Sequence, residues 1–287
     1  MNEPRTPEPP YPAQRQEPPG VEGAMRPAAD HGEQSYRGCG RLRGRAAIIT
    51  GGDSGIGRAV ALAFAREGAD VLISYLSEHE DARESVRLVE DAGRRAVAVA
   101  GDVGEISHCA AIVDRAMAEF ERLDILVNNA AYQQVHDSIT EHPAEEIEHI
   151  FRTNILAMFW LCQAAVPHMR DGAAIINTAS IQAYEPSPTL LPYATTKGAI
   201  VTFTKGLAQE LTPKGIRVNA VAPGPVWTPL IPMSMPEEQI EQFGADTPVG
   251  RTAQPAELAP PYVFLASDEA RFVSGEILAV TGGKLTA

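Results

Sequence analysis

The chain has 287 residues, 44% of them hydrophobic, and carries 24 basic against 37 acidic residues, for a net charge of −13. This acidity argues against nucleic acid or an anionic membrane as a partner, and no apolar run reaches the roughly 18 residues that cross a bilayer. The N-terminus also lacks the apolar core of a signal peptide, so we expect a cytoplasmic protein that acts on a small molecule.

Residues 1–42 differ in composition from the rest of the chain. Eight of the 23 prolines lie in the first 40 residues, and proline prevents a helix or sheet from running through such a segment. One interpretation is a disordered tail. The other, which we favour, is an ordered arm that lies across a subunit interface. The apolar residues that could anchor such an arm are Tyr11, Val21, Met25 and Tyr36.

From residue 43 to 287 the sequence alternates between strand and helix patterns. The predicted strands are Ala46–Ile49, Ala69–Tyr75, Arg95–Ala100, Asp124–Asn128, Ala173–Thr178, Arg217–Ala222 and Ile277–Val280. The predicted helices begin near Ile56 and then cover Ala82–Ala92, Ile106–Phe120, Pro143–Met169 and Tyr193–Leu211. This order predicts a single α/β domain with a doubly wound, Rossmann-like parallel sheet of about seven strands and helices on both faces. Residues 223–252, rich in Pro, Met and Gly, are predicted to form a substrate loop with a short helix.

A glycine-rich turn follows the first predicted strand. It reads Thr50-Gly51-Gly52-Asp53-Ser54-Gly55-Ile56-Gly57, and the helical pattern begins within it. Glycines at such a turn let a pyrophosphate approach the backbone and let the helix pack close to the strand, while the helix N-terminus attracts the anion. The alternative is an ordinary turn that happens to be rich in glycine. The flanking strand and helix favour a dinucleotide site.

Polar residues follow several other predicted strands. Asp102 follows the third strand, Asn129 the fourth, Ser180 the fifth and Pro223-Gly224 the sixth. In parallel sheets of this kind ligands bind beyond the carboxyl ends of the strands. These residues therefore mark one crevice.

Tyr193 and Lys197 are four residues apart in the motif Tyr-Ala-Thr-Thr-Lys and so share one face of a helix. An ammonium beside a tyrosine favours the phenolate and should lower the pKa of Tyr193 toward neutrality. Tyr193 could then exchange a proton with a substrate oxygen, which the hydroxyl of Ser180 could also bind. The motif alone is often only a surface pair, but the glycine turn upstream supports the catalytic interpretation.

With these motifs, residues 43–283 resemble the short-chain dehydrogenase/reductase family, and the Pro-rich arm resembles that of its stress-associated bacterial members. The resemblance implies hydride transfer between nicotinamide C4 and a carbonyl or alcohol carbon. It implies that Ser180, Tyr193 and Lys197 are catalytic, that Asn154 holds a water in the proton relay, and that Lys197 also binds the nicotinamide ribose. Residues implied in cofactor binding are Gly51, Asp53, Ser54, Gly55, Ile56, Gly57, Tyr75, Leu76, Asp102, Val103, Asn129, Ala130, Ala131, Tyr193, Lys197, Pro223, Gly224, Val226 and Thr228. Ala131 departs from the family pattern, in which glycine usually follows the Asn-Asn-Ala segment.

The choice between NAD and NADP depends on the end of the second strand, at Tyr75 and Leu76. An acidic residue there would bind the ribose 2′-hydroxyl of NAD, whereas an arginine would accommodate the 2′-phosphate of NADP. Neither is present, but Asp53, Glu78 and Glu80 are nearby in the sequence. We therefore favour NAD.

The substrate is expected to be a small aldehyde, ketone or sugar, with Gln182, Tyr184 and Trp227 among the pocket walls. The alternatives are a 3-oxoacyl-carrier-protein reductase, a glucose dehydrogenase, or a cofactor-binding regulatory or structural protein without turnover. The family resemblance also implies a homotetramer. No disulfide or metal site is expected, because the three cysteines are far apart and His136, His142, His149 and His168 are dispersed along the sequence.

Overall fold

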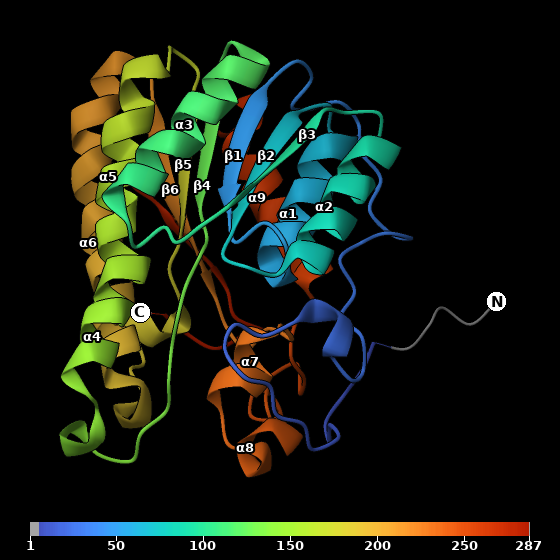
Figure 1. The fold of residues 1–287 in the computed structure, drawn as a ribbon, viewed down its shortest axis with the longest axis vertical. Helices are drawn as coiled ribbons and strands as arrows, with labels where there is room; N and C mark the ends of the chain where they lie inside the picture. Colours follow the sequence, from blue (N-terminus) through green and yellow to red (C-terminus); the bar gives the residue numbers. More distant parts are fainter. Residues whose placement is uncertain (1–5, 287) are drawn as a thin grey trace.

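The computed structural model describes residues 6–286 and contains a seven-stranded, all-parallel sheet in the order β3-β2-β1-β4-β5-β6-β7 (Figure 1). The strands are β1 (Ala46–Thr50), β2 (Asp70–Tyr75), β3 (Ala96–Ala100), β4 (Ile125–Asn128), β5 (Ala174–Thr178), β6 (Arg217–Pro223) and β7 (Ile277–Val280). The central strands are buried along their whole length, because helices cover both faces of a parallel sheet. The predicted fold class is confirmed.

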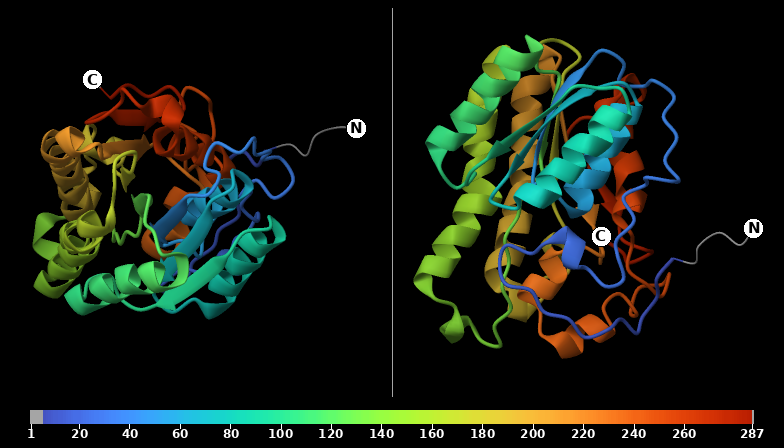
Figure 2. Two further views of the ribbon diagram at one scale, coloured as in Figure 1. Left: turned by 90° about the horizontal axis from the view of Figure 1, so that it is seen from above. Right: turned by 45° about the vertical axis from the view of Figure 1, so that its right-hand side comes forward.

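Helices cover both faces of the sheet, and the short helices within residues 230–241 lie beyond the ends of its strands (Figures 1 and 2). The helices are α1 (Gly55–Arg66), α2 (His79–Asp91), α3 (Ile106–Phe120), α4 (Ala144–Phe151), α5 (Ala157–Ala165), α6 (Leu191–Leu211), α7 (Leu230–Ser234), α8 (Glu237–Glu241) and α9 (Pro255–Ala266). One apolar core includes residues of α1, α2 and α9, and a second, on the opposite face, includes residues of α3, α5 and α6. No described helix is long and apolar enough to span a membrane.

Helix α9 is a feature that the sequence analysis did not predict. It contains Pro260 and Pro261, residues that normally disfavour a helix interior. A capping box joins the side chains of Gln254 and Glu257 to the first turn, and the helix packs along α1. Capping and burial together offset the unfavourable prolines.

The long helix predicted for Pro143–Met169 is interrupted in the structure. Between α4 and α5 the residues Arg152–Leu156 form a π-helical turn, and Val166–His168 ends the segment as a 3₁₀ turn. The π turn is a bulge in the helix, and such bulges are frequent at functional sites. It contains Asn154, which is buried.

The described part of the N-terminal arm, from residue 6 onward, packs on its own chain (Figure 1, dark blue). The ring of Tyr11 stacks on that of Trp227 with centroids 4.2 Å apart, and its hydroxyl bonds Thr252 at 2.7 Å. The indole nitrogen of Trp227 donates to the carbonyl of Pro27 at 2.8 Å. The expected anchors Tyr11 and Met25 are buried, whereas Val21 is exposed. The anchoring contacts therefore fall on the chain's own substrate loop.

Candidate active site

A cleft runs along the carboxyl ends of the strands, as the strand-end residues predicted. It consists of two adjoining cavities that share Gly51, Ser54, Ala130, Ala131, Pro229 and Leu230. The first cavity is also lined by the predicted site residues Gly55, Ile56, Asn129, Ser180, Gln182, Tyr193, Lys197, Pro223, Gly224, Val226 and Thr228. The second is also lined by Asp53, Tyr75, Leu76, Asp102 and Val103.

The glycine-rich turn forms the boundary between the two cavities, and its glycines have steric roles. Gly51 has φ +61°, and a Cβ on Gly57 would lie 1.8 Å from the carbonyl oxygen of Gly51. A side chain at residue 57 would therefore push α1 away from β1. Such close approach of helix and turn is what a pyrophosphate-binding turn requires.

Asn129 and Thr50 brace this turn against β4. The Asn129 amide nitrogen donates to the carbonyls of Thr50 and Gly51 at 3.1 and 3.3 Å. The hydroxyl of Thr50 accepts from the backbone amides of Asn129 and Ala130 at 2.9 and 3.0 Å. These bonds fix the turn relative to the neighbouring strand, so the cleft floor is formed before any ligand binds.

Tyr193 and Lys197 lie in α6 and face the cleft from one side. The Lys197 ammonium lies 5.2 Å from the centre of the Tyr193 ring, and it donates to the carbonyl of Thr178 at 2.8 Å. Burial raises the pKa of Tyr193 to about 12, although a hydrogen bond with Ser180 opposes the shift. Burial lowers the pKa of Lys197 to about 7. The predicted shift of the Tyr193 pKa toward neutrality is therefore wrong, because desolvation by burial outweighs the hydrogen bond with Ser180.

Asn154 is not among the residues that line the cleft. Its side-chain oxygen accepts from the Tyr132 amide at 2.8 Å, and its nitrogen donates to the Tyr132 carbonyl at 2.9 Å and to Thr196 at 3.1 Å. The residue thus joins the loop after β4 to helix α6. Its side chain satisfies both backbone polar groups of Tyr132.

The second cavity has an acidic wall. Its lining residues include Asp53, Glu78 and Asp102, and among the described residues no lysine or arginine lines it. Burial, reinforced by the nearby charge of Glu78, raises the pKa of Asp53 to about 7. Arg58 donates to the backbone carbonyl of Asp53 and not to its carboxyl group, so it does not neutralise this wall.

A protein-family model described as Enoyl-(Acyl carrier protein) reductase matches residues 51–284. A short-chain dehydrogenase from Burkholderia cenocepacia J2315, solved in complex with NADP, is 33% identical, with a TM-score of 0.79 over 85% of this chain and 98% of that chain. The chain belongs to the short-chain dehydrogenase/reductase family. It is therefore an NAD(P)-dependent oxidoreductase.

Two curated relatives of this dehydrogenase extend over nearly the full chain. General stress protein 39 of Bacillus subtilis is 50% identical over 92% of this chain and 93% of its own length. Glucose and ribitol dehydrogenase of Daucus carota is 46% identical over 96% of this chain and 97% of its own length. Both alignments are too long to be confined to the parallel-sheet domain, so they extend into the N-terminal arm.

Besides Asn154, three residues predicted for the dehydrogenase site lie outside the cleft lining. Trp227 is fully buried beneath Tyr11 of the arm, so the structure does not place it in a substrate wall. Tyr184 is 36% exposed and lines none of the cavities described here. Gly57 lies behind the turn, where its contact with Gly51 shapes the cleft indirectly.

The arm contributes residues to the site that sequence reasoning missed. Pro18, Pro19 and Gly20 line the second cavity. The Glu22 carboxylate accepts a 2.7 Å hydrogen bond from the amide of Gly55, at the N-terminus of α1, and lies 3.2 Å from Nε2 of His31. Hydrogen bonding to His31 and to Gly55 lowers the pKa of Glu22 in spite of its burial, and the carboxylates of Glu22 and Glu33 raise the pKa of His31 in spite of burial. No periodic pattern in a Pro-rich segment signals such a pair.

Proposed function

We propose that this dehydrogenase interconverts a small polyol or sugar and its carbonyl form, with NAD as the preferred cofactor. The observation that supports the reaction is the convergence of Ser180, Tyr193 and Lys197 on one cleft beside the glycine-rich turn. The cofactor, when bound, supplies or accepts the hydride at nicotinamide C4. The protein's residues then have to bind the substrate oxygen and move its proton.

Tyr193 is the proposed general acid and base. In carbonyl reduction its phenol gives a proton to the substrate oxygen as the carbon receives hydride, and in alcohol oxidation its phenolate takes that proton back. With a pKa raised to about 12, the protein alone holds Tyr193 as the neutral phenol at pH 7. Tyr193 can therefore act directly as the proton donor in reduction.

Ser180 and Lys197 are proposed to position the reacting groups. The Ser180 hydroxyl would hydrogen-bond the same substrate oxygen, so that the carbonyl points at Tyr193. Lys197 would hold the hydroxyls of the nicotinamide ribose, and its ammonium would favour ionisation of Tyr193 during alcohol oxidation. Asn154, which bonds the backbone at Tyr132, would hold the water that passes the proton to solvent.

The cavity next to the catalytic cleft supports a polyhydroxylated substrate. It is lined by Gln182, Glu185, Gln239, Gln242, Asp246 and Lys284, among others. Side-chain amides donate and accept hydrogen bonds and carboxylates accept them, so together these groups can bind several hydroxyls at once. Lys284 pairs with Asp246, which leaves no free cation in the described part of this cavity for the phosphate of a carrier-protein arm. The named activity of the Daucus carota relative favours the same substrate class.

The preference for NAD is supported by the acidic wall of the second cavity. A 2′-phosphate placed beside Asp53 and Glu78 would meet carboxylates and no described lysine or arginine. Two of the solved relatives contain NADP or NADPH, so a preference for NAD would distinguish this chain from them. A tenfold preference corresponds to about 1.4 kcal/mol.

A direct test is turnover of a panel of aldoses, pentitols, hexitols and short aldehydes with NAD(H) and NADP(H) in parallel. We expect activity on polyols or aldoses, with NAD preferred at least tenfold in kcat/KM. Tyr193→Phe should bind NADH with a Kd close to that of the wild type and lose at least three orders of magnitude in kcat. Activity on acyl thioesters alone would favour the carrier-protein reductase. Binding without turnover of any substrate would favour a regulatory protein.

The assembly is proposed to be a cytoplasmic homotetramer. Phe159, on α5, is 46% exposed and packs edge-on against Phe203 of α6, with ring centroids 4.6 Å apart. Leu156 beside it is 38% exposed. An exposed aromatic patch spanning two helices suits burial against a second copy. Sedimentation equilibrium would measure the mass, and a monomeric mass would refute the assembly.

A further inference from the structure

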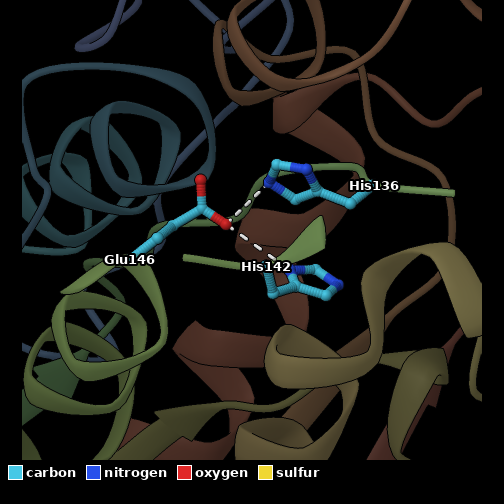
Figure 3. A group of neighbouring side chains, drawn as sticks. All are labelled: His136, His142 and Glu146. Atoms are coloured by element: carbon cyan, nitrogen blue, oxygen red, sulfur yellow. Dashed lines mark hydrogen bonds and ion pairs between the residues drawn. The ribbon is translucent and has the colours of Figure 1, made fainter. Parts of the chain in front are cut away.

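A second cluster of chemically active side chains lies away from the catalytic tyrosine, where the loop after β4 meets α4. Figure 3 shows the imidazoles of His136 and His142 converging on the carboxylate of Glu146. Glu146 Oε1 lies 2.9 Å from Nε2 of His136 and 3.5 Å from Nδ1 of His142. The expectation that these histidines are dispersed is therefore wrong for this pair, because the loop folds back on the helix start.

Among the described residues, the Glu146 carboxylate pairs with the two imidazoles and with no other cationic group. Within residues 6–286 no lysine or arginine forms an ion pair with Glu146. The side chain of His142 is fully buried, while those of His136 and Glu146 are 25% and 17% exposed. The buried Nε2 of His142 has no hydrogen-bond partner among the described residues, whereas its Nδ1 contacts the Glu146 carboxylate at 3.5 Å. To bind an ion through Nδ1, His142 would carry its proton on Nε2, and the ion would take the place of the proton between Nδ1 and the carboxylate.

The donor set and its spacing suit a particular class of ion. We propose that His136, His142 and Glu146 bind a divalent transition metal of the zinc type. Two imidazoles and a carboxylate are zinc-type ligands, whereas calcium and magnesium prefer oxygen alone. One donor atom from each residue lies within 4.8 Å of the others, and a tetrahedral ion with bonds of about 2.0–2.1 Å needs its ligands roughly 3.3 Å apart. His136 and Glu146 are partly exposed and can close this gap by side-chain rotation.

The ion would connect the loop after β4 to the first turns of α4, and three protein ligands would leave a fourth position for water. This loop borders the catalytic cleft. The amide of His136 donates to the carbonyl of Thr189 at 3.1 Å, just before α6, and Gln133 lines the cleft and bonds Ser234 at 2.8 Å. The site would therefore stabilise the cleft wall without taking part in hydride transfer. It does not depend on the proposed substrate.

The test is metal titration of the full chain, purified without a polyhistidine tag and treated with EDTA. Calorimetry with Zn²⁺ and visible absorption with Co²⁺ should both show one equivalent per chain. The Co²⁺ spectrum should show d–d bands of nitrogen and oxygen ligands and no thiolate charge-transfer band. A thiolate band would place the ion at the exposed Cys39 instead and overturn the proposal.

Matched variants identify the ligands. His136→Gln and Glu146→Gln should each weaken Zn²⁺ binding at least tenfold, while His168→Gln, at an exposed histidine outside the cluster, should bind as the wild type does. Circular dichroism in EDTA checks that each variant is folded. If a variant does not fold, X-ray absorption of the zinc-loaded wild type should show two imidazoles in the first shell. Absence of saturable binding, unchanged affinity in His136→Gln, or a shell without imidazole would each refute the site.

Discussion

The Glu22 carboxylate pairs with His31 inside the N-terminal arm and also joins the arm to α1 through the Gly55 amide, and this double contact makes a quantitative prediction. Glu22→Gln keeps an oxygen that can accept from the Gly55 amide but removes the charge that faces His31 and the N-terminus of α1. A hydrogen bond to a charged group contributes about 1.5–3 kcal/mol, and a partly buried charge at a helix terminus up to ~2 kcal/mol. Since the amide preserves part of the bond, we expect a loss of about 2 kcal/mol.

The pH dependence follows from the directions of the two shifts. The pKa of His31 is raised, so its contribution to stability is fully present below the unfolded value of about 6.5 and is lost as the pH rises through the folded value. The pKa of Glu22 is lowered, so its contribution is present above about 4.3 and is lost as the pH falls through the folded value. The difference between wild type and variant should therefore be largest near pH 6 and should shrink by pH 9.

The assay is thermal unfolding of wild type, Glu22→Gln and the exposed arm variant Glu17→Gln at pH 6 and pH 9. A loss of 2 kcal/mol should lower the Tm of Glu22→Gln by about 4–6 °C near pH 6, and Glu17→Gln should match the wild type at both values. Taking differences at each pH cancels the titration of other groups. An equal loss at both pH values would refute the contribution of the Glu22–His31 pair, and no loss at pH 6 would refute Glu22 as the link between the arm and α1.

Three further predictions concern the cleft. Gly57→Ala should abolish cofactor binding or folding, because its Cβ would lie 1.8 Å from the Gly51 carbonyl oxygen. The control is Gly206→Ala, at an exposed helical glycine with open space around it, which should be neutral or stabilising by up to ~1 kcal/mol. Calorimetry with NADH compares the two variants. Lys197 has a pKa lowered to about 7, so at this residue the folded state binds fewer protons than the unfolded one, and its contribution to stability should rise from pH 7 to 10. Denaturant titration should therefore show that the free energy of unfolding of the wild type, relative to that of Lys197→Met, increases over this range. Deleting residues 1–31 removes Pro18, Pro19 and Gly20 from the second cavity and should raise the Kd for NADH at least threefold. An unchanged Kd, measured by fluorescence, would show that the arm does not contribute to cofactor binding.

The sheet was predictable because its strands are continuous apolar runs. The predicted strand Ala69–Tyr75 agrees with β2 to within one residue. It could be found because a strand that is buried on both faces needs apolar side chains along its length. Helix α9 was not predictable in the same way, because the capping box and the contact with α1 that offset its prolines involve tertiary structure. The conformation of the arm could not be predicted for a related reason. The residues that hold it contact Trp227 and Gly55, which are remote in the sequence.

In the candidate site, too, some features follow from local sequence patterns and others depend on tertiary structure. The glycine turn, Ser180, Tyr193 and Lys197 could be identified because each has a fixed place relative to a strand end or helix. The direction of the Tyr193 pKa could not, because it depends on burial that no spacing reveals. The convergence of His136, His142 and Glu146 also depends on how one loop turns back on a helix start. Local patterns therefore predicted which residues meet at the cleft, whereas tertiary packing determines their pKa values.

The contact between Tyr11 and Thr252 has a consequence for how the chain is made. The two residues are 241 positions apart, and at ribosomal rates of roughly 5–20 residues per second the first must wait on the order of 10–50 seconds for the second to be synthesised. The arm thus emerges first but docks last. Until it does, the outer wall of the second cavity is missing, so the complete pocket exists only in a chain whose synthesis has almost finished.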